Sequence, residues 1–156
     1  MYIFLDIDGV LNRSCQWRNL YTLDTGCINA FVKAMQPYNP KIILISSWRK
    51  GFLTQGNKNN SEPIRRLEQL FQEHNIRIVS KTEVLLHQSR DKEIEQFLVK
   101  HPTVEQEGYI ILDDDINEYA SGYSNSRLYL IAAENGFSSR DAAVLKKVIK
   151  SHCKNS

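Results

Sequence analysis

The sequence predicts an α/β protein, a three-layer sandwich around a five-stranded, mainly parallel, Rossmann-like sheet. Short runs rich in isoleucine and leucine recur along the chain, and most are nearly continuous, as in strands buried on both faces of a parallel sheet. Helical patterns fill the intervals between them. Because 156 residues suffice for one ordinary core, we expect a single domain over 1–152 and a C-terminal tail over 153–156.

The expected elements follow one another in βα order. Strands are expected at 2–5, 41–46, 76–79, 108–112 and 128–131, and helices near 25–36, 61–74, 91–100, 115–121 and 139–152. Asp24 or Thr25 can cap the first helix, and Asp91 the third. Ser138 or Ser139 can cap the last.

Two irregular stretches, 12–24 and 50–60, interrupt this alternation. Neither is long enough to fold as a domain, so no large cap domain is expected. The stretch 50–60 is polar and contains glycine, which predicts a mobile loop. It follows the hydroxyls of Ser46 and Ser47, so we expect it to border the substrate.

Composition places the chain among ordinary globular proteins. Hydrophobic residues make up 42% and charged residues 24%, and the net charge is only +2, which gives no strong electrostatic case for nucleic acid. Three cysteines without metal spacing indicate neither a disulfide framework nor a zinc site. The N-terminal apolar run stops at Asp6, too early for a signal peptide or a membrane span. We therefore expect a soluble, cytoplasmic protein.

Reactive side chains cluster in four places, three of them directly after an apolar run. Asp6 and Asp8 end the first run, Ser46 to Arg49 end the second, and Asp113 to Asp115 end the fourth. Arg90 to Lys92 open a helical pattern. Open α/β sheets bind ligands beyond the carboxyl ends of their strands, so these groups are expected to share one edge. Clustered carboxylates repel and call for a cation, and oxygen ligands near phosphate favour Mg²⁺.

The first acid pair indicates nucleophilic chemistry. Asp6 is a carboxylate able to attack phosphorus and form an aspartyl-phosphate, and Asp8 can protonate the leaving oxygen and then activate water. Residues i and i+2 of a strand share a face, so both acids can point toward one site. Asp113 and Asp114 would complete a Mg²⁺ site, whereas Asp115 is expected to cap the following helix.

The chain resembles the haloacid dehalogenase-like (HAD) hydrolases over most of its length. The resemblance is carried by Asp-Ile-Asp-Gly-Val-Leu-Asn at 6–12, the serines at 46–47, the basic residues at 90–92 and the acidic triplet at 113–115, in the family's order. Ile-Ser-Ser-Trp-Arg at 45–49 and Glu-Asn-Gly-Phe-Ser at 134–138 are similar to the small, capless HAD domain of Swiss Army Knife RNA repair proteins.

The resemblance implies a role for each group. Asp6 is the nucleophile and Asp8 the acid, with the backbone carbonyl of Asp8 among the Mg²⁺ ligands. Asp113 or Asp114 ligates the metal directly, and this choice stays open. The phosphoryl group would be bound by the hydroxyl of Ser46, with Ser47 as the alternative. A basic residue, Arg90 or Lys92, would bind it as well. Asp91 stands where the family's Arg-Gly pattern has glycine, so the choice between the two basic residues stays open.

Other residues near the expected site are candidates for binding the rest of the substrate. These are Asn12, Ser47, Trp48 and Arg49. Trp48 can stack on a base or sugar, or can belong to the core, and Arg49 can meet a second phosphate.

The sequence thus predicts a Mg²⁺-dependent phosphohydrolase for phosphomonoesters. Its substrate would be a nucleotide, a nucleic-acid end or a phosphoprotein, which an open site can admit. Two alternatives remain: a catalytically weak binding or regulatory module, and a phosphoacceptor domain like the receivers of signalling pairs. Receivers carry their phosphoacceptor on a middle strand in sequence, which the first-strand position of Asp6 does not match.

Overall fold

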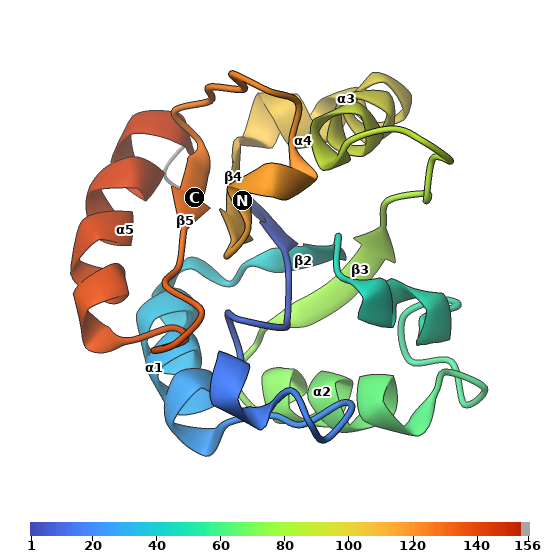
Figure 1. Ribbon diagram of the computed structural model, residues 1–156, viewed down its shortest axis with the longest axis vertical. Helices are drawn as coiled ribbons and strands as arrows, with labels where there is room; N and C mark the ends of the chain where they lie inside the picture. The colour runs from blue at the N-terminus through green and yellow to red at the C-terminus, as the bar shows by residue number, and fades with distance from the viewer. Residues whose placement is uncertain (154–156) are drawn as a thin grey trace.

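A computed structural model describes residues 1–153, which form a parallel sheet covered by helices on both faces (Figure 1). The strands are β1 (Tyr2–Leu5), β2 (Lys41–Leu44), β3 (Arg77–Lys81), β4 (Tyr109–Asp113) and β5 (Leu128–Leu130). Their order across the sheet is β3-β2-β1-β4-β5, and every neighbouring pair is parallel. This is the Rossmann-like order, whereas receiver domains have the order 2-1-3-4-5. The receiver alternative therefore does not fit the topology.

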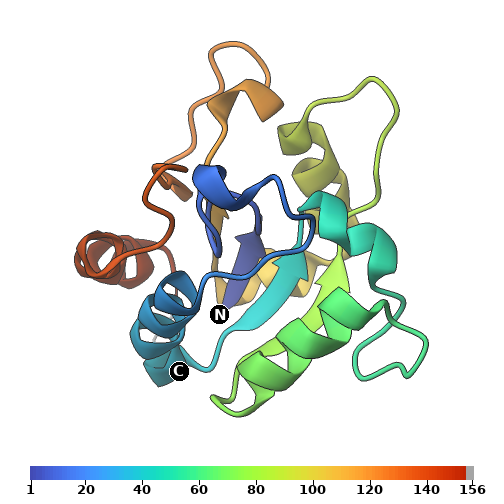
Figure 2. The same ribbon diagram turned by 60° about the horizontal axis from the view of Figure 1, so that its bottom comes forward.

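Helices form the outer two layers (Figures 1 and 2). The longer helices are α1 (Thr25–Met35), α2 (Glu62–Gln72), α3 (Arg90–Lys100), α4 (Pro102–Glu107) and α5 (Ser139–His152). Short 3₁₀ helices are η1 (Ser14–Gln16), η2 (Gln36–Tyr38), η3 (Ser47–Gly51) and η4 (Ile116–Glu118). Helices α1, α2 and α5 cover one face, while α3 and α4 cover the other.

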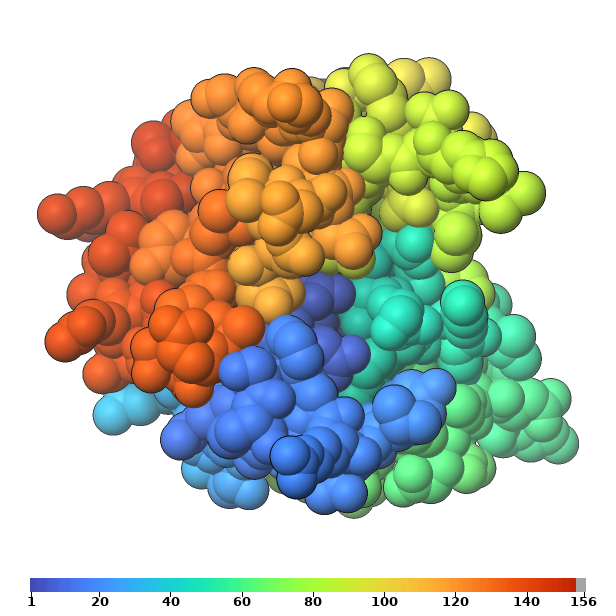
Figure 3. Space-filling view, viewed as in Figure 1, coloured from blue at the N-terminus to red at the C-terminus, as the bar shows by residue number. Residues whose placement is uncertain are grey.

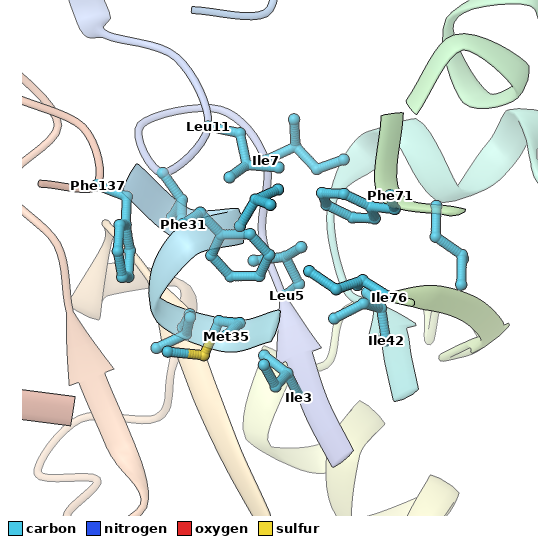
Figure 4. Packing of buried hydrophobic residues seen from close by; sticks show 14 of the residues in the cluster. Ile3, Leu5, Ile7, Leu11, Phe31, Met35, Ile42, Phe71, Ile76 and Phe137 are labelled. Atoms are coloured by element: carbon cyan, nitrogen blue, oxygen red, sulfur yellow. The ribbon is translucent and has the colours of Figure 1, made fainter. Parts of the chain in front are cut away.

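The core consists of two apolar clusters separated by the sheet. Alternate strand residues point to opposite faces, so Ile3 and Leu5 join α1, α2 and α5 on one side, and Phe4 faces α3 and α4 on the other. Figure 4 shows the larger cluster, in which Phe31 lies between Phe71 and Phe137 with ring centroids 5.6 and 5.4 Å away. Burial on both faces explains why the strands read as continuous apolar runs.

The expected fold class is confirmed, and all five strands lie where the sequence predicts them within a few residues. Asp24 caps α1 by accepting a hydrogen bond from the Cys27 amide, and Ser138 caps α5 in a capping box. Asp91 does not cap α3, because the N-cap position is Ser89. The Asp91 carboxylate instead accepts from the Ala120 amide, 2.9 Å away, and ties α3 to the loop after η4.

The structure differs from the expected elements in three further places. The helix expected at 115–121 is only the single turn η4, and α4 was not expected at all. Cys153, expected in the tail, is buried against the core at the end of α5, and residues 154–156 lie outside the described part of the chain. Within residues 1–153, no helix combines the length and apolar character needed to cross a membrane.

Candidate active site

The register of the sheet brings the acids together. Leu5 of β1 is paired with Leu44 of β2 and Leu112 of β4, so these three strands end at one level. The Asp6 amide donates to the Leu112 carbonyl across 2.9 Å, which continues the pairing beyond the last strand residue. Asp6 and Asp113 therefore leave adjacent central strands side by side, as the sequence predicts.

Asp113 is the most enclosed acid of the site, with no exposed surface. Its Oδ1 accepts from the amides of Asp114 and Asp115 at 2.8 and 3.1 Å. Its Oδ2 accepts from Arg90 Nη1 at 2.5 Å and from the Tyr119 hydroxyl at 2.8 Å. Burial and the Asp113 charge raise the pKa of Tyr119 above its ordinary value, which keeps this donor protonated. All four lone-pair positions of Asp113 are thus occupied.

Asp6 lies beside this cluster and is 6% exposed. Arg90 Nη1 is 3.7 Å from Asp6 Oδ1, so one guanidinium serves both Asp6 and Asp113. Burial, followed by the charge of Asp113, raises the pKa of Asp6 well above its ordinary value, and Arg90 only partly opposes this. The isolated site therefore holds more negative charge than Arg90 can balance.

Asp114 projects toward Asp6 from the turn after β4. Oxygen atoms of Asp6, Asp113 and Asp114, one from each carboxylate, lie within 4.8 Å of one another. Burial and the neighbouring Asp113 raise the pKa of Asp114 to about 6. Gly9 makes room for this carboxylate: its φ is +78°, and a Cβ there would overlap the Asp114 side chain. The glycine after Asp8 is thus required by the close approach of Asp114.

Asp8 is held by two nitrogen donors. Asn12 Nδ2 donates to Asp8 Oδ1 at 2.8 Å, and the indole of Trp48 donates to Asp8 Oδ2 at 3.2 Å. Asn12 also accepts from the amide of Gly9 and the indole of Trp17, and is 1% exposed. Asn12 was expected to bind substrate, but its amide is enclosed and fully engaged, so it positions Asp8 instead.

An open cavity of about 440 Å³ lies over these groups. In Figure 3 the dark-blue residues after β1 lie at the bottom of a hollow between the blue segment 12–24, teal η3 and the light-orange segment after β4. The lining residues are Asp6, Asp8, Trp17, Asn19, Leu20, Tyr21, Ser47, Trp48, Arg90, Asp114, Asp115 and Glu118. The cavity thus joins the acids to an aromatic wall.

The structure separates Arg90 from the other two basic candidates. Arg90 lines the cavity, whereas Lys92 is on the exposed side of α3 and pairs with Glu95 at 2.7 Å. Arg49 was expected to meet a second phosphate, but it is 7% exposed and bound to Glu93, with Nη1–Oε2 and Nη2–Oε1 distances of 2.9 and 3.1 Å. Arg49 therefore anchors η3 to α3 and does not line the cavity.

The two serines after β2 are also distinguished. Ser46 is 1% exposed, and its hydroxyl accepts from the Trp48 amide as the N-cap of η3. Ser47 is exposed and lines the cavity, so the structure favours the alternative candidate for contact with substrate. Trp48 belongs to the core, as one of the two interpretations expected, and is only 3% exposed; it also forms part of the cavity wall, and its stacking on a substrate stays a prediction.

The irregular stretch 50–60, which the sequence places beside the substrate, does not border the active-site cavity. Phe52, Leu53 and Thr54 instead line a separate cavity of about 350 Å³ beside β3 and α3. Asn60 is buried and bonds to the Leu53 amide and the Thr54 carbonyl, which gives the loop internal structure. The wall of the active-site cavity comes instead from 12–24.

Several site residues were not found from the sequence. Trp17, Leu20 and Tyr21 line the cavity mouth, and Tyr119 holds Asp113. Large apolar residues inside an otherwise polar stretch were a usable signal for the first three. Tyr119 had none, because its contact with Asp113 depends on how the chain turns through η4. Asp115 caps η4 as expected, accepting from the Asn117 amide at 2.8 Å, and also lines the cavity.

The fold and the site together define the class. A Rossmann-like parallel sheet with an Asp-x-Asp pair after its first strand, and further acids after the adjacent strand, is the arrangement of HAD-like hydrolases. The family model described as the HAD domain in Swiss Army Knife RNA repair proteins matches residues 2–142, and the chain belongs to this family. Comparison with curated proteins and with solved structures gives no match. Residues 1–153, which the structure describes, form no large cap over the sheet.

Proposed function

We propose that the protein is a Mg²⁺-dependent phosphatase that hydrolyses phosphomonoesters through an aspartyl-phosphate on Asp6. The observation that carries this proposal is the packing of Asp6, Asp113 and Asp114 around one point, with Arg90 as their cationic neighbour. HAD-family membership supports hydrolase chemistry at this acid cluster.

The donor set suits Mg²⁺. Asp6 and Asp114 offer carboxylate oxygens, the ligands that this ion prefers, and the burial and the Asp113 charge that raise the pKa of Asp6 would be opposed by a further positive charge. Asp6 and Asp114 would hold the ion, because the lone pairs of Asp113 are already occupied. When bound, Mg²⁺ would neutralise these acids and withdraw charge from the phosphoryl oxygens.

The chain's own residues supply the bond-making and proton-transfer steps. A carboxylate oxygen of Asp6 attacks phosphorus as the bond to the leaving oxygen breaks, and Asp8 gives that oxygen its proton. Asp8 then takes a proton from a water molecule that attacks the aspartyl-phosphate, which releases inorganic phosphate and restores Asp6. Arg90 stabilises the negative charge on the phosphoryl group, and Ser47, which lines the cavity, would donate to one of its oxygens.

The test is release of phosphate from p-nitrophenyl phosphate, with Mg²⁺ and then with a chelator. We expect turnover only with the metal, and a loss of several orders of magnitude in Asp6→Asn, whose amide cannot act as the nucleophile. Glu95→Gln makes the same chemical change at an exposed position of α3 and should keep full activity. A folded Asp6→Asn protein with half the wild-type rate would contradict the mechanism, and turnover unaffected by chelation would contradict the metal.

The same experiment addresses the alternatives. Lasting labelling of Asp6 by a phosphodonor, without turnover, would indicate a phosphoacceptor domain. Binding of Mg²⁺ without turnover of any phosphomonoester would indicate a catalytically weak binding module.

A further inference from the structure

Three large apolar side chains are exposed at the mouth of the active-site cavity. Trp17 is 45% exposed, Leu20 84% and Tyr21 48%, and all three line the cavity. They come from one short segment, 12–24, and the chemical step described above uses none of these three side chains. Exposed apolar side chains gathered beside a catalytic centre indicate a surface that a ligand covers.

The segment holds Tyr21 in a fixed and unfavourable conformation. Its φ is +60°, a region that residues other than glycine seldom occupy. Its carbonyl accepts from Arg66 Nη2 at 3.0 Å, and its ring packs edge-to-face on Trp48 with centroids 5.1 Å apart. These contacts keep the Tyr21 ring on the cavity wall, as expected where local strain serves a function.

The aromatic wall begins at the catalytic acid and extends outward. The Trp48 indole donates to Asp8, which would protonate the leaving oxygen, and the Tyr21 ring packs edge-to-face on Trp48. Trp17 is tied to the same acid through Asn12, whose Oδ1 it reaches at 3.0 Å. The aromatic side chains would therefore contact parts of the leaving group that lie beyond the oxygen that Asp8 protonates. This arrangement suits an aromatic ring separated from the phosphate oxygen by a spacer better than a ring attached directly to that oxygen.

The charge of the cavity limits how many phosphates the substrate can carry. Asp114, Asp115 and Glu118 line it together with the catalytic acids, and among its described lining residues the cation is Arg90, already shared between Asp6 and Asp113. Glu118 Oε2 is a further 3.7 Å neighbour of Arg90. A second phosphate close to the first would meet these acids without a free partner, so a polyphosphate or a nucleic-acid backbone is disfavoured.

We propose that the cavity takes a nucleoside monophosphate, with its phosphate at Asp6 and its base against Trp17 and Tyr21. This inference rests on the proposed phosphatase function and names its substrate class. The cavity volume of about 440 Å³ lies within the range of sites for small organic ligands, about 300–1,000 Å³. Aromatic side chains bind bases by stacking without selecting one base strongly, so we expect broad tolerance of the base.

The test uses substrates that differ only in the base. Adenosine 5′-monophosphate is compared with ribose 5-phosphate, and adenosine 3′-monophosphate with ribose 3-phosphate, so each pair shares its sugar and the position of its phosphate, and the pair with the better nucleotide gives the ratio. Stacking on one aromatic ring is worth about 5- to 150-fold, so we expect kcat/KM to favour the nucleotide by at least about 5-fold. The readout is a ratio within one enzyme, so any loss common to both substrates cancels.

The variants separate stacking from structural effects. Trp17→Ala and Tyr21→Gly should each lower the ratio by about 5-fold or more, and glycine suits the positive φ at 21. Trp17→Phe keeps a ring but loses the bond to Asn12, and should retain most of the ratio. Val99→Ala removes an apolar side chain that is 83% exposed on α3, away from the cavity, and should leave the ratio at the wild-type value.

A wild-type ratio near one, or a ratio unchanged in both Trp17→Ala and Tyr21→Gly, would overturn the proposal. So would a phosphorylated oligonucleotide with a higher kcat/KM than either mononucleotide, which would identify a nucleic-acid end as the substrate. If no monoester is hydrolysed, the phosphatase function fails by itself. In that case, calorimetry measures the affinities for adenosine monophosphate and for ribose 5-phosphate and tests whether the cavity binds the base. Tighter binding of the nucleotide, lost in Trp17→Ala, supports base recognition. Equal binding of the two ligands, or no binding of either, refutes it.

Discussion

Replacing Asp114 by asparagine should stabilise the metal-free protein above about pH 6 while it weakens the response to Mg²⁺. Burial, followed by the charge of Asp113, raises the pKa of Asp114 to about 6 from its ordinary value of 3.8. The folded state therefore binds a proton more tightly than the unfolded state. Because of this, ionisation of Asp114 lowers stability as the pH rises from about 4 to about 6, and the loss is complete at higher pH.

The pKa difference sets the size of the effect. A shift from 3.8 to about 6 corresponds to at most about 3 kcal/mol of unfolding free energy. The Asp114 carboxylate is only partly buried and borders the open cavity, so screening by water should reduce this to about 1–2 kcal/mol. For a chain of this length, that is a rise in Tm of about 2–8 °C.

The assay is urea unfolding in a chelator at a series of pH values. Asp114→Asn should match the wild type near pH 4 and exceed it at pH 7, whereas Glu95→Gln, an exposed control, should stay within about 0.5 kcal/mol of the wild type throughout. Saturating Mg²⁺ should reverse the order at pH 7, since ligand at 100 times its Kd adds about 2.7 kcal/mol to the protein that binds it. A variant less stable than the wild type at pH 7 without metal would refute the reasoning.

Three further predictions concern the acid, the buried ion pair and the loop 50–60. Asp8→Asn should slow an alkyl phosphate by about 10²–10⁴-fold and a nitrophenyl phosphate far less, because a good leaving group needs no proton; equal losses in the two rates would exclude Asp8 as the acid. Glu93→Gln leaves the buried Arg49 guanidinium without its counter-ion and should cost about 3–5 kcal/mol in urea unfolding, and a cost below about 1 kcal/mol would contradict the buried pair. Shortening the loop tip at 55–58 should change kcat/KM by less than about 3-fold for small and large substrates alike, because these residues do not line the cavity; a selective loss on large substrates would restore the loop as a substrate contact.

The sheet could be predicted from the sequence because the burial of a central strand on both faces also determines that its residues are apolar. Strands such as 41–44 and 109–112 are buried on both faces, so nearly every residue is apolar and the run is easy to recognise. Helices with weaker amphipathic patterns were harder to place. Helix α4 has six residues and begins at Pro102 directly after α3, so no separate periodic pattern distinguishes it.

The acids of the site were predictable because they follow directly from strand register. Once Leu5 is aligned with Leu112, Asp6 and Asp113 must emerge together. Arg49 was misassigned because sequence proximity to Ser46 and Ser47 does not reveal a counter-ion, and Glu93 lies 44 residues further along the chain. Such a contact depends on how α3 packs against η3, which local patterns do not specify.

In the proposed phosphatase, the segment 12–24 would connect recognition to catalysis at a site that has no large cap among residues 1–153. A lid can remove water from a reacting phosphate, but here the cavity is open, so dehydration of Asp6, the proposed nucleophile, would have to come from the fold itself. Asp6 is 6% exposed, and this burial makes its carboxylate dependent on nearby positive charge. Asn12 then links the two parts of the site, since one amide orients Asp8 and anchors Trp17. In the proposed mechanism, a ligand that contacts the Trp17 ring would therefore also influence the position of Asp8, so that one contact would align the leaving group with its acid.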